Sequence, residues 1–429
     1  VPIAVGINGA ALGGGYEIAL ACHRRFALDD RSVKIGLPEA MLGLMPGAGG
    51  VVRMVRMLGM QDALTLISQG KQLNAARALE KGLVHELAGS EEEMAQKARA
   101  WILSNPEARQ PWEEPGYSLP GGTPDDAATQ GLTYFGPVNV MNQTRGNMTA
   151  PQVIIAAVID TARVDYDTAH VVEARYFQRL LLDQVARNMM TTFFVQMNRL
   201  DAGASRPEGI DATDVQKLGI LGAGVMGAGI AFAAARVGIE VVLKDLSLEN
   251  AEKGKAYAAT ACDKSRRIDE NQARQILARI HPTGDASDLA DCDLVIEAVF
   301  ENREVKAAVT RETEAVLGDS AVLASNTSAL PITELAEASE RPENFIGMHF
   351  FSPAERMPLV EIITGEKTSP ECLARAFDLA QKLGKKPIVV KDAPGVFTTR
   401  VIGQTITQGQ RMLAEGVNPA LIENAAAFN

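Results

Sequence analysis

The chain has 429 residues, enough for about two to four domains of ordinary size. Its 53 acidic side chains outnumber 42 basic ones and give a net charge of −11, which argues against a nucleic-acid partner because phosphate binding needs clustered Lys and Arg. A phosphate-bearing ligand would therefore have to be held by local features such as helix N-termini.

Neither the cysteines nor the histidines form a recognisable metal or redox motif. The 4 Cys form no CxxC pair, which is typical of free thiols in a reducing compartment, and the 5 His show no HExxH spacing, so no metal site is expected. No apolar run reaches about 18 residues, so we expect no transmembrane helix. Because the chain starts with Val1 inside a strand-like run and ends in a helical pattern, we expect both ends to be cut.

The first 150 residues mix short strands with helices. Residues 2–8 predict a buried strand, and the run Gly13-Gly14-Gly15 leads into an apolar helix. Residues 105–125 are rich in Pro and Gly and predict an irregular surface segment. Further helices are predicted over residues 51–69, 74–82 and 90–104.

A helical pattern then joins the two halves of the chain. VVEARYFQRLLLDQVARNMMTTFFVQMNRL (171–200) carries apolar residues with a period near 3.6 and has no internal Pro or Gly, which predicts a long connecting helix. Residues 202–214 predict a short polar connector. From Val215 strands alternate with helices, the pattern of a parallel sheet with crossover helices.

A glycine fingerprint follows the first strand of that second half. VQKLGIL (215–221) runs into Gly222-Ala223-Gly224-Val225-Met226-Gly227, an Ala-rich helix follows, and the next strand ends at Asp245. A bare GxGxxG is weak evidence, and a glycine turn without a ligand is the alternative. The order strand, turn, helix, strand and acidic residue predicts a dinucleotide site.

Each residue of the fingerprint has a physical role in that interpretation. Gly222 permits the tight turn, Gly224 lets the backbone approach the pyrophosphate, and Gly227 lets the helix pack close to the sheet. The helix N-terminus offers free N–H groups to the pyrophosphate. Asp245 should accept hydrogen bonds from the ribose and repel a 2′-phosphate, which favours NAD over NADP.

A histidine and a glutamate could supply the chemistry of alcohol oxidation. His349 ends an apolar run in FIGMHFFSP, and Glu361 follows in PLVEII. His is the natural base near neutral pH, and a carboxylate facing its other nitrogen would fix the tautomer. On spacing alone the pairing is weak, since a lone histidine at a strand end is more often structural.

Five ordered motifs, GAGVMGAGIA, ASNTS, GMHFFSP, LVEII and KDAPG, resemble the 3-hydroxyacyl-CoA dehydrogenase family over about residues 215–429. The resemblance implies that His349 is the base, that Glu361 orients it and that Ser328 helps to bind the substrate. It also implies that four residues lie around NAD: Met226, Asp245, Glu301 and Lys306.

One position departs from the family pattern. Where the family usually has Asn before the Arg that follows DxPG, this chain has Thr399 before Arg400. Threonine keeps one donor and one acceptor but is shorter, so we predict a weaker hold on the substrate carbonyl and reduced or altered turnover. Kinetics of Thr399→Asn test this, and no gain in the variant would count against it.

The first half carries two glutamates near glycine turns, Glu17 in ALGGGYE and Glu39 in IGLPE. Adding water across an activated double bond needs one group to deprotonate water and another to protonate the α-carbon, and paired carboxylates can do both. Backbone donors at a helix N-terminus would stabilise the charge on the thioester oxygen. On the residues alone, a helix-start charge and a surface group are the commoner explanations.

The segments INGAALGGGYEIALAC, KIGLPEAMLGLMPGAGG and RMLG resemble the enoyl-CoA hydratase (crotonase) family, and within it the hydratase part of multifunctional fatty-acid oxidation alpha subunits. The resemblance implies that Glu17 and Glu39 are the catalytic acids and that the N–H of Gly14 is half of the oxyanion hole. The other donor and much of the CoA site would precede Val1. We therefore expect this chain to lack hydratase activity that a longer parent has, and hydration of crotonyl-CoA by the chain would refute this.

The predicted fold is α/β, in four parts: the C-terminal part of a crotonase-type domain at 1–150, a linking helix and connector at 151–214, a Rossmann-type NAD-binding domain at 215–390, and the start of an all-helical dehydrogenase domain at 391–429. The expected function is hydration of trans-2-enoyl-CoA and oxidation of L-3-hydroxyacyl-CoA, with NAD as cofactor. The resemblance also implies enoyl-CoA isomerase activity, a thiolase beta subunit as partner, an oligomer, and a bacterial cytoplasmic or else mitochondrial location.

Two alternatives stay open. The first is a non-catalytic acyl-CoA-binding scaffold subunit, against which the joint presence of Glu17, Glu39, His349 and Glu361 argues, whereas Thr399 leaves it open. The second is a biosynthetic reductase that uses NADPH, against which Asp245 argues. An assay of NAD reduction with 3-hydroxybutyryl-CoA, and a comparison of the two cofactors, would separate them.

Overall fold

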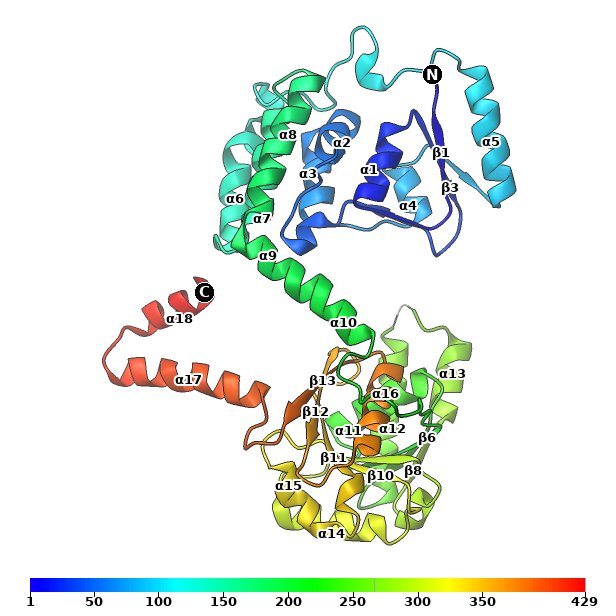
Figure 1. Ribbon diagram of the computed structural model, residues 1–429, viewed down its shortest axis with the longest axis vertical. Coiled ribbons are helices and arrows are strands. Elements are labelled where there is room, and N and C mark those ends of the chain that lie inside the picture. The colour runs from blue at the N-terminus through cyan, green and yellow to red at the C-terminus, as the bar shows by residue number, and fades with distance from the viewer. Residues whose placement is uncertain (266, 429) are drawn as a thin grey trace. The chain divides into compact units, whose positions relative to one another are not determined.

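A computed structural model describes residues 1–265 and 267–428. The chain divides into two compact units (Figure 1). Unit 1 comprises Val1–Met197 together with the segment that begins at Pro419, and unit 2 comprises Asn198–Asn418. The predicted domain boundaries at 150, 214 and 390 remain predictions.

Unit 1 contains two small parallel sheets covered by helices. One sheet has the order β1-β3-β5 and the other pairs β2 with β4. The strands are β1 (Ala4–Ile7), β2 (Ala10–Leu12), β3 (Arg24–Leu28), β4 (Lys34–Gly36) and β5 (Glu86–Ala88). The strand predicted at 2–8 is thus confirmed as β1, but it is not the buried strand expected, since only Ile7 of β1 is buried. Apolar faces of α1, α2, α3 and α7 meet in one buried core, which fixes the turns between strands and helices.

The helices of this unit are α1 (Gly14–Ala21), α2 (Gly50–Leu58), α3 (Met60–Ser68), α4 (Ala75–Glu80), α5 (Glu91–Ser104), α6 (Gly136–Thr144), α7 (Thr149–Thr161), α8 (Tyr166–Leu181), α9 (Gln184–Met190) and α18 (Pro419–Phe428). Shorter turns lie at η1 (Glu39–Leu42), η2 (Pro111–Glu113), η3 (Ala127–Thr129), η4 (Gly131–Phe135) and η5 (Thr191–Gln196). The helix α10 (Met197–Asp201) follows η5.

The prediction of one long helix over 171–200 is wrong. The helix α8 ends at Leu181, and α9 begins at Gln184 with Asp183 as its N-cap, whose side chain accepts a 2.8 Å hydrogen bond from the N–H of Val185. An aspartate at this position satisfies a free amide of a new helix better than it serves a helix interior. The predicted helix at 51–69 is likewise two helices, since Gly59 separates α2 from α3 with a φ of 81°.

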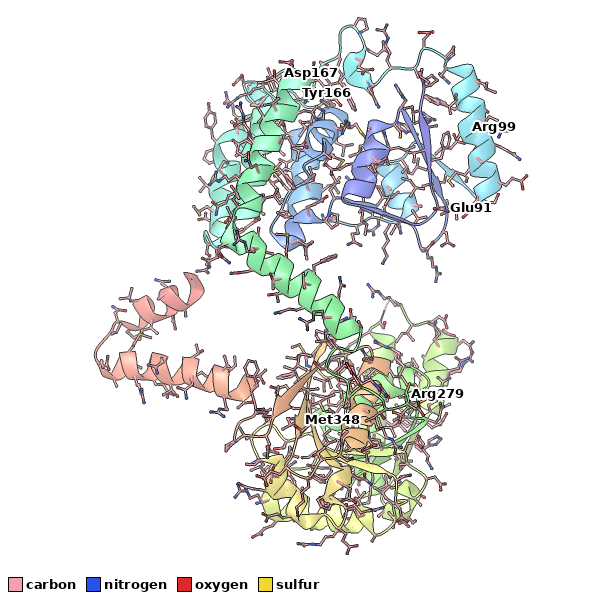
Figure 2. The ribbon with its side chains drawn as sticks, viewed as in Figure 1. Glu91, Arg99, Tyr166, Asp167, Arg279 and Met348 are labelled. Atoms are coloured by element: carbon pink, nitrogen blue, oxygen red, sulfur yellow. The ribbon has the colours of Figure 1, made fainter. Side chains whose placement is uncertain are left out.

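The Pro- and Gly-rich segment at 105–125 is irregular, as predicted, apart from the turn η2. It is nevertheless packed in part, because the ring of Trp112 stacks on Tyr166 at the start of α8 with 5.5 Å between centroids. Gln110 is buried as well. Tyr166 is labelled in Figure 2, where the segment that carries η2 lies at this end of the helix.

Unit 2 is built on one sheet of eight strands in the order β13-β12-β11-β10-β9-β6-β7-β8. The strands are β6 (Lys217–Leu221), β7 (Glu240–Lys244), β8 (Ile280–Thr283), β9 (Leu294–Glu297), β10 (Val322–Ser325), β11 (Phe345–Phe350), β12 (Leu359–Thr364) and β13 (Lys386–Lys391). All neighbouring strands are parallel except β11 and β12. From β8 to β11 this is the doubly wound order, whose switch point lies between β6 and β9.

Helices cover both faces of this sheet with separate buried cores. On one face pack α11 (Val225–Arg236), α12 (Leu248–Asp263), α13 (Glu270–Ala278) and α16 (Pro370–Lys382). On the other pack α14 (Arg303–Glu314), α15 (Ile332–Leu335) and the turn η6 (Ala286–Leu289), and Figure 1 shows α14 and α15 together at one end of the unit. Short turns η7 (Ala336–Ala338) and η8 (Pro342–Asn344) precede β11, and α17 (Thr398–Ala414) follows β13. The predicted Rossmann-type fold is confirmed.

The predicted polar connector at 202–214 is fastened to unit 2 by an ion pair. Arg206 contacts both carboxylate oxygens of Asp378 on α16, at 2.7 and 2.9 Å, and Thr213 donates to the same carboxylate through its N–H and its hydroxyl. Paired guanidinium and carboxylate groups of this geometry are directional, so the connector is held in a defined path.

Within the described ranges, no helix combines the length and the apolar character that a bilayer crossing requires.

Candidate active sites

The glycine turn lies at the switch point of the unit 2 sheet, between the end of β6 and the start of α11. Gly222 has a φ of 95°, and a Cβ there would lie 2.7 Å from the carbonyl oxygen of Ala298 at the end of β9. A Cβ at Gly227 would lie 1.8 Å from the carbonyl oxygen of Gly222. Both positions therefore require glycine, the first for its backbone conformation and the second for close packing of the helix.

The remaining glycine faces open space. A Cβ built on Gly224 meets nothing within 4 Å, and Gly224 is the N-cap residue of α11, where no described side chain caps the helix. The amides of the first helical turn can thus donate to an anion, as a pyrophosphate requires. Met226 is half-buried against the core behind the turn. These residues fit a dinucleotide such as NAD.

Asp245 lies beside this turn, as the sequence predicts. Its Oδ2 accepts a 2.7 Å hydrogen bond from the N–H of Ala223, and its Oδ1 accepts one of 2.7 Å from the N–H of Leu246. Oδ1 also accepts a 3.3 Å hydrogen bond from Nδ2 of Asn250, so Oδ2 is the oxygen that keeps a lone pair for a ribose hydroxyl, and the negative charge would oppose a 2′-phosphate.

Asp245→Asn should therefore lower the ratio of NAD to NADP affinity about tenfold, which corresponds to about 1.4 kcal/mol. Calorimetric titration of both nucleotides measures this ratio. Asp291→Asn is the matched control, because Asp291 is an exposed acid of the same unit. An unchanged ratio in Asp245→Asn would show that this carboxylate does not select the cofactor.

The sheet brings His349 and Glu361 together. They are directly opposite each other on the antiparallel strands β11 and β12, and the ring Nδ1 lies 2.6 Å from Oε2 of Glu361. The neighbouring residue Met348, labelled in Figure 2, is buried in the core on the other face of the strand. With Nδ1 engaged by the carboxylate, Nε2 is the nitrogen that can accept a proton.

Glu361 is held on its other side by the start of α17. Its Oε1 accepts from the N–H of Thr398 and its Oε2 from the hydroxyl of Thr398, both at 2.9 Å, and the carboxylate is fully buried. Burial alone would raise the pKa of Glu361, but the hydrogen bonds from His349 and Thr398 outweigh it, so the pKa is lowered. The carboxylate is thus kept ionised beside the imidazole. Thr399, by contrast, is exposed.

The polar turn after β10 is hydrogen-bonded to β11, the strand that carries His349 (the histidine strand). Asn326 accepts a 2.8 Å hydrogen bond from the N–H of Phe350, next to His349. Ser328 is exposed, and its N–H donates to Oε1 of Glu301 at 3.1 Å. The adjacent carbonyl of Ala329 accepts from the N–H of Gly395 in the DAPG loop. The structure therefore gathers the turn of Ser328, the histidine strand and the DAPG loop at one edge of the sheet.

The side chain of Lys306 is buried next to this turn and does not reach the surface. Its ammonium is 2.8 and 3.0 Å from the two oxygens of Glu297 and 3.2 Å from Glu301, and the side chains of Lys306 and Glu297 are each 2% exposed. The pKa of Glu301 is lowered, because hydrogen bonds from Thr327 and Lys306 outweigh the effect of burial. Lys306 thus compensates two carboxylates, which leaves its direct contact with NAD a prediction.

A cavity of about 860 Å³ opens beside the DAPG loop and the start of α17. It is lined by Val390, Lys391, Asp392, Ala393, Val396, Phe397, Arg400, Val401, Gln404 and Thr405. Its wall therefore continues from the residues next to Thr398, which holds the carboxylate partner of His349.

In unit 1 the structure places both predicted glutamates at the glycine run. The carboxylate of Glu17 on α1 is buried, and its Oε1 accepts from the N–H of Ala48 at 2.7 Å and of Gly50 at 2.8 Å. Glu39 begins η1, and its Oε1 lies 3.0 Å from where a Cβ of Gly13 would stand. Gly14, the first residue of α1, is exposed with open space at its Cα.

Glu39 differs from Glu17 in its surroundings. Its Oε2 is buried and has no hydrogen-bond partner among the described residues. Burial and the charge of Glu17 raise the pKa of Glu39 to about 7. A carboxyl group that keeps its proton near neutral pH, beside a carboxylate that accepts two backbone N–H bonds, is an arrangement suited to an acid and a base.

Four residues at these sites were not predicted from the sequence: Asn326, Thr398, Glu297 and Glu173. Asn326 lies within the predicted ASNTS turn and Thr398 next to the predicted Thr399, so neighbouring motifs signalled both. Glu297 ends β9, and neither its burial nor its contact with Lys306 was predicted. Glu173 on α8 gave no signal, because its partners lie more than a hundred residues earlier in the chain.

Two family models match the chain. Residues 217–393 match the family described as 3-hydroxyacyl-CoA dehydrogenase, NAD binding domain, and residues 1–108 match enoyl-CoA hydratase/isomerase. The cofactor of the matched dehydrogenase domain is NAD, as predicted.

Relatives cover nearly the whole chain. The fatty acid oxidation complex subunit alpha of Shewanella amazonensis is 36% identical over 97% of this chain and 59% of its own length. That of Shewanella baltica is 36% identical over 99% of this chain and 60% of its own length. The chain thus spans about three fifths of the curated relatives it matches.

Solved structures match about half of the chain. The (S)-3-hydroxybutyryl-CoA dehydrogenase of Ralstonia eutropha is 39% identical, with 48% of this chain and 74% of that chain covered and a TM-score of 0.47. The two family models occur in the order in which the sequence motifs predicted them. The chain therefore combines an enoyl-CoA hydratase/isomerase domain with a 3-hydroxyacyl-CoA dehydrogenase NAD-binding domain, and over nearly its whole length it is similar to fatty acid oxidation complex alpha subunits.

Proposed function

We propose that the protein oxidises L-3-hydroxyacyl-CoA to 3-ketoacyl-CoA with NAD, and that its first half takes part in hydration of trans-2-enoyl-CoA to the same 3-hydroxyacyl-CoA. The observation that carries the proposal is the buried pair of His349 and Glu361 on the sheet whose switch point holds the glycine turn. Imidazole base, oriented carboxylate and dinucleotide turn are the parts that alcohol oxidation needs.

In the proposed oxidation, Nε2 of His349 takes the proton of the 3-hydroxyl group. Glu361 stabilises the imidazolium that forms and keeps its Nδ1–H directed, and Thr398 keeps the carboxylate in place. Ser328 is exposed at the same edge of the sheet and would donate to the substrate oxygen. Bound NAD would supply the hydride acceptor at its nicotinamide. We propose that the acyl chain enters the cavity beside α17.

In the proposed hydration, Glu17 removes a proton from water while Glu39 gives its proton to the α-carbon. The raised pKa of Glu39 supports its role as the acid, and the two backbone N–H bonds to Glu17 support a carboxylate as the base. The N–H of Gly14 at the start of α1 would donate to the thioester oxygen as negative charge develops there.

The names of the relatives support a wider assembly. Because they are bacterial and are called subunits of a fatty acid oxidation complex, we propose acyl-CoA substrates, a thiolase beta subunit as partner, an oligomer, and a place in the bacterial cytoplasm.

Reduction of NAD in the presence of 3-hydroxybutyryl-CoA, followed by the absorbance of NADH, tests the proposed oxidation. The chain should reduce NAD and not NADP. Nucleotide binding without turnover would favour a scaffold subunit, and faster turnover with NADP would favour a biosynthetic reductase.

A further inference from the structure

The loop at 46–50 of unit 1 lies between two buried carboxylates from different helices. Glu17 on α1 accepts from the N–H groups of Ala48 and Gly50. Glu173 on α8 accepts from the N–H of Gly49 at 2.5 Å and of Val52 at 2.9 Å, and it is 1% exposed. The two carboxylates thus bind different N–H groups of one short segment.

Close packing on several sides requires the glycines of this loop, and for Gly49 the nearest atom to a Cβ would be Nη1 of Arg53 at 1.9 Å. A Cβ at Gly47 would lie 2.5 Å from the ring of Phe177, and a Cβ at Gly49 would lie 2.6 Å from the ring of His170. A Cβ at Gly50 would lie 2.7 Å from Oε1 of Glu17. The loop is therefore packed directly against side chains of both helices and has no room to move closer to either, so a displacement of one helix toward it would be transmitted to the other.

Burying a carboxylate where a helix packs is energetically unfavourable. An apolar residue at position 173 would serve a packing surface, whereas Glu173 is buried with a pKa raised to about 7 by loss of solvent. Its two backbone hydrogen bonds offset part of that cost. The nearby charges are Glu17 and Arg53, and Arg53 donates to the carbonyl of Ala48 in the same loop.

We propose that Glu173 is a positioning residue for hydration: by holding the N–H groups of Gly49 and Val52, it fixes the loop whose other N–H groups orient the carboxylate of Glu17. The inference rests on the proposed hydratase function of unit 1. It makes α8, outside the residues that match the hydratase family, part of that active site.

Three variants test the proposal through crotonyl-CoA hydration, each made in this chain and in the longer parent that is expected to have the hydratase activity. Glu173→Ala should lower kcat roughly 10- to 100-fold with KM changed less than about twofold, since misplacing a reacting group by about 1 Å costs up to that factor. Glu173→Gln should fall between it and the unsubstituted protein, because an amide keeps one acceptor oxygen. Asp167→Asn, the exposed acid of the same helix labelled in Figure 2, should behave as the unsubstituted protein does.

The amide of Ala48 gives a second measurement that does not depend on turnover. It donates to Glu17 and not to Glu173, so loss of a mere structural support at Glu173 would leave it unchanged. With ¹⁵N-alanine labelling, we expect its hydrogen exchange to rise more than about tenfold in Glu173→Ala and less in Glu173→Gln. The same signal should move in Glu17→Gln, which assigns it.

The two measurements separate the possible failures. The positioning role is overturned if Glu173→Gln lowers the thermal stability but leaves the hydrogen exchange of the Ala48 amide unchanged. If Glu173→Ala does not fold, Glu173→Gln alone tests the proposal. If the protein without any of these substitutions does not hydrate crotonyl-CoA, the proposed hydration by this chain fails. The Ala48 signal would still decide the role of Glu173.

Discussion

Replacing His349 by glutamine is expected to slow NAD reduction with 3-hydroxybutyryl-CoA by about 10²- to 10⁴-fold, the range of general-base catalysis. The ring is buried, with its Nδ1 held 2.6 Å from Glu361, so Nε2 is the nitrogen left to accept the hydroxyl proton. Glutamine approximates the size of the ring but cannot take up a proton. NAD affinity should be unchanged, because the glycine turn lies between β6 and α11 and Asp245 directly follows β7, away from β11.

A matched histidine makes this result specific. His281 on β8 also pairs with a glutamate, Glu240 on β7, at 2.8 Å, but both are exposed, and β9, β10 and β6 separate these strands from β11. His281→Gln should therefore keep full turnover. Glu361→Gln should lose activity too, since an amide would stabilise the imidazolium far less than the carboxylate does. Retention of more than about a tenth of the turnover in His349→Gln would exclude this residue as the base.

The local structure could be predicted where a binding site requires particular residues at fixed spacing. The glycine turn, the strand before it and the acid after the next strand were placed correctly, because turn geometry and helix packing leave no other residue at Gly222 and Gly227. The pairing of His349 with Glu361 was weak on spacing alone. It depends on the antiparallel register of β11 and β12, which a separation of 12 residues allows but does not fix.

What the sequence could not provide were contacts between distant segments. Glu173 reaches amides 121 and 124 residues away, and nothing in a helical pattern distinguishes it from a solvated charge. The break at Asp183 was hidden for a related reason, because apolar periodicity continues through the cap. Burial of Lys306 was also hidden, since a charged residue on a helix is exposed in most proteins.

The buried cluster around Lys306 leads to the largest stability effect that we expect. Lys306→Met should lower the free energy of unfolding by about 3–5 kcal/mol, because it leaves the carboxylate of Glu297 buried without its cation. Glu297 also receives the hydroxyl of Ser325, so its position in the sheet is fixed and it cannot turn to solvent. Chemical denaturation of the purified chain, monitored in unit 2, measures the change.

A second substitution tests the cause. In the double variant Glu297→Gln with Lys306→Met no charge is left buried at that pair, so part of the lost stability should return. Lys253→Met is the matched control, because its pair with Glu249 is on the surface of α12 with both side chains more than half exposed, and such pairs contribute about 0–1 kcal/mol. If Lys306→Met unfolds like this control but binds NAD more weakly, then Lys306 acts on the nucleotide and not on the fold. A loss of stability that the double variant partly reverses, with NAD affinity retained, instead assigns Lys306 to the support of Glu301 and the turn that carries Ser328.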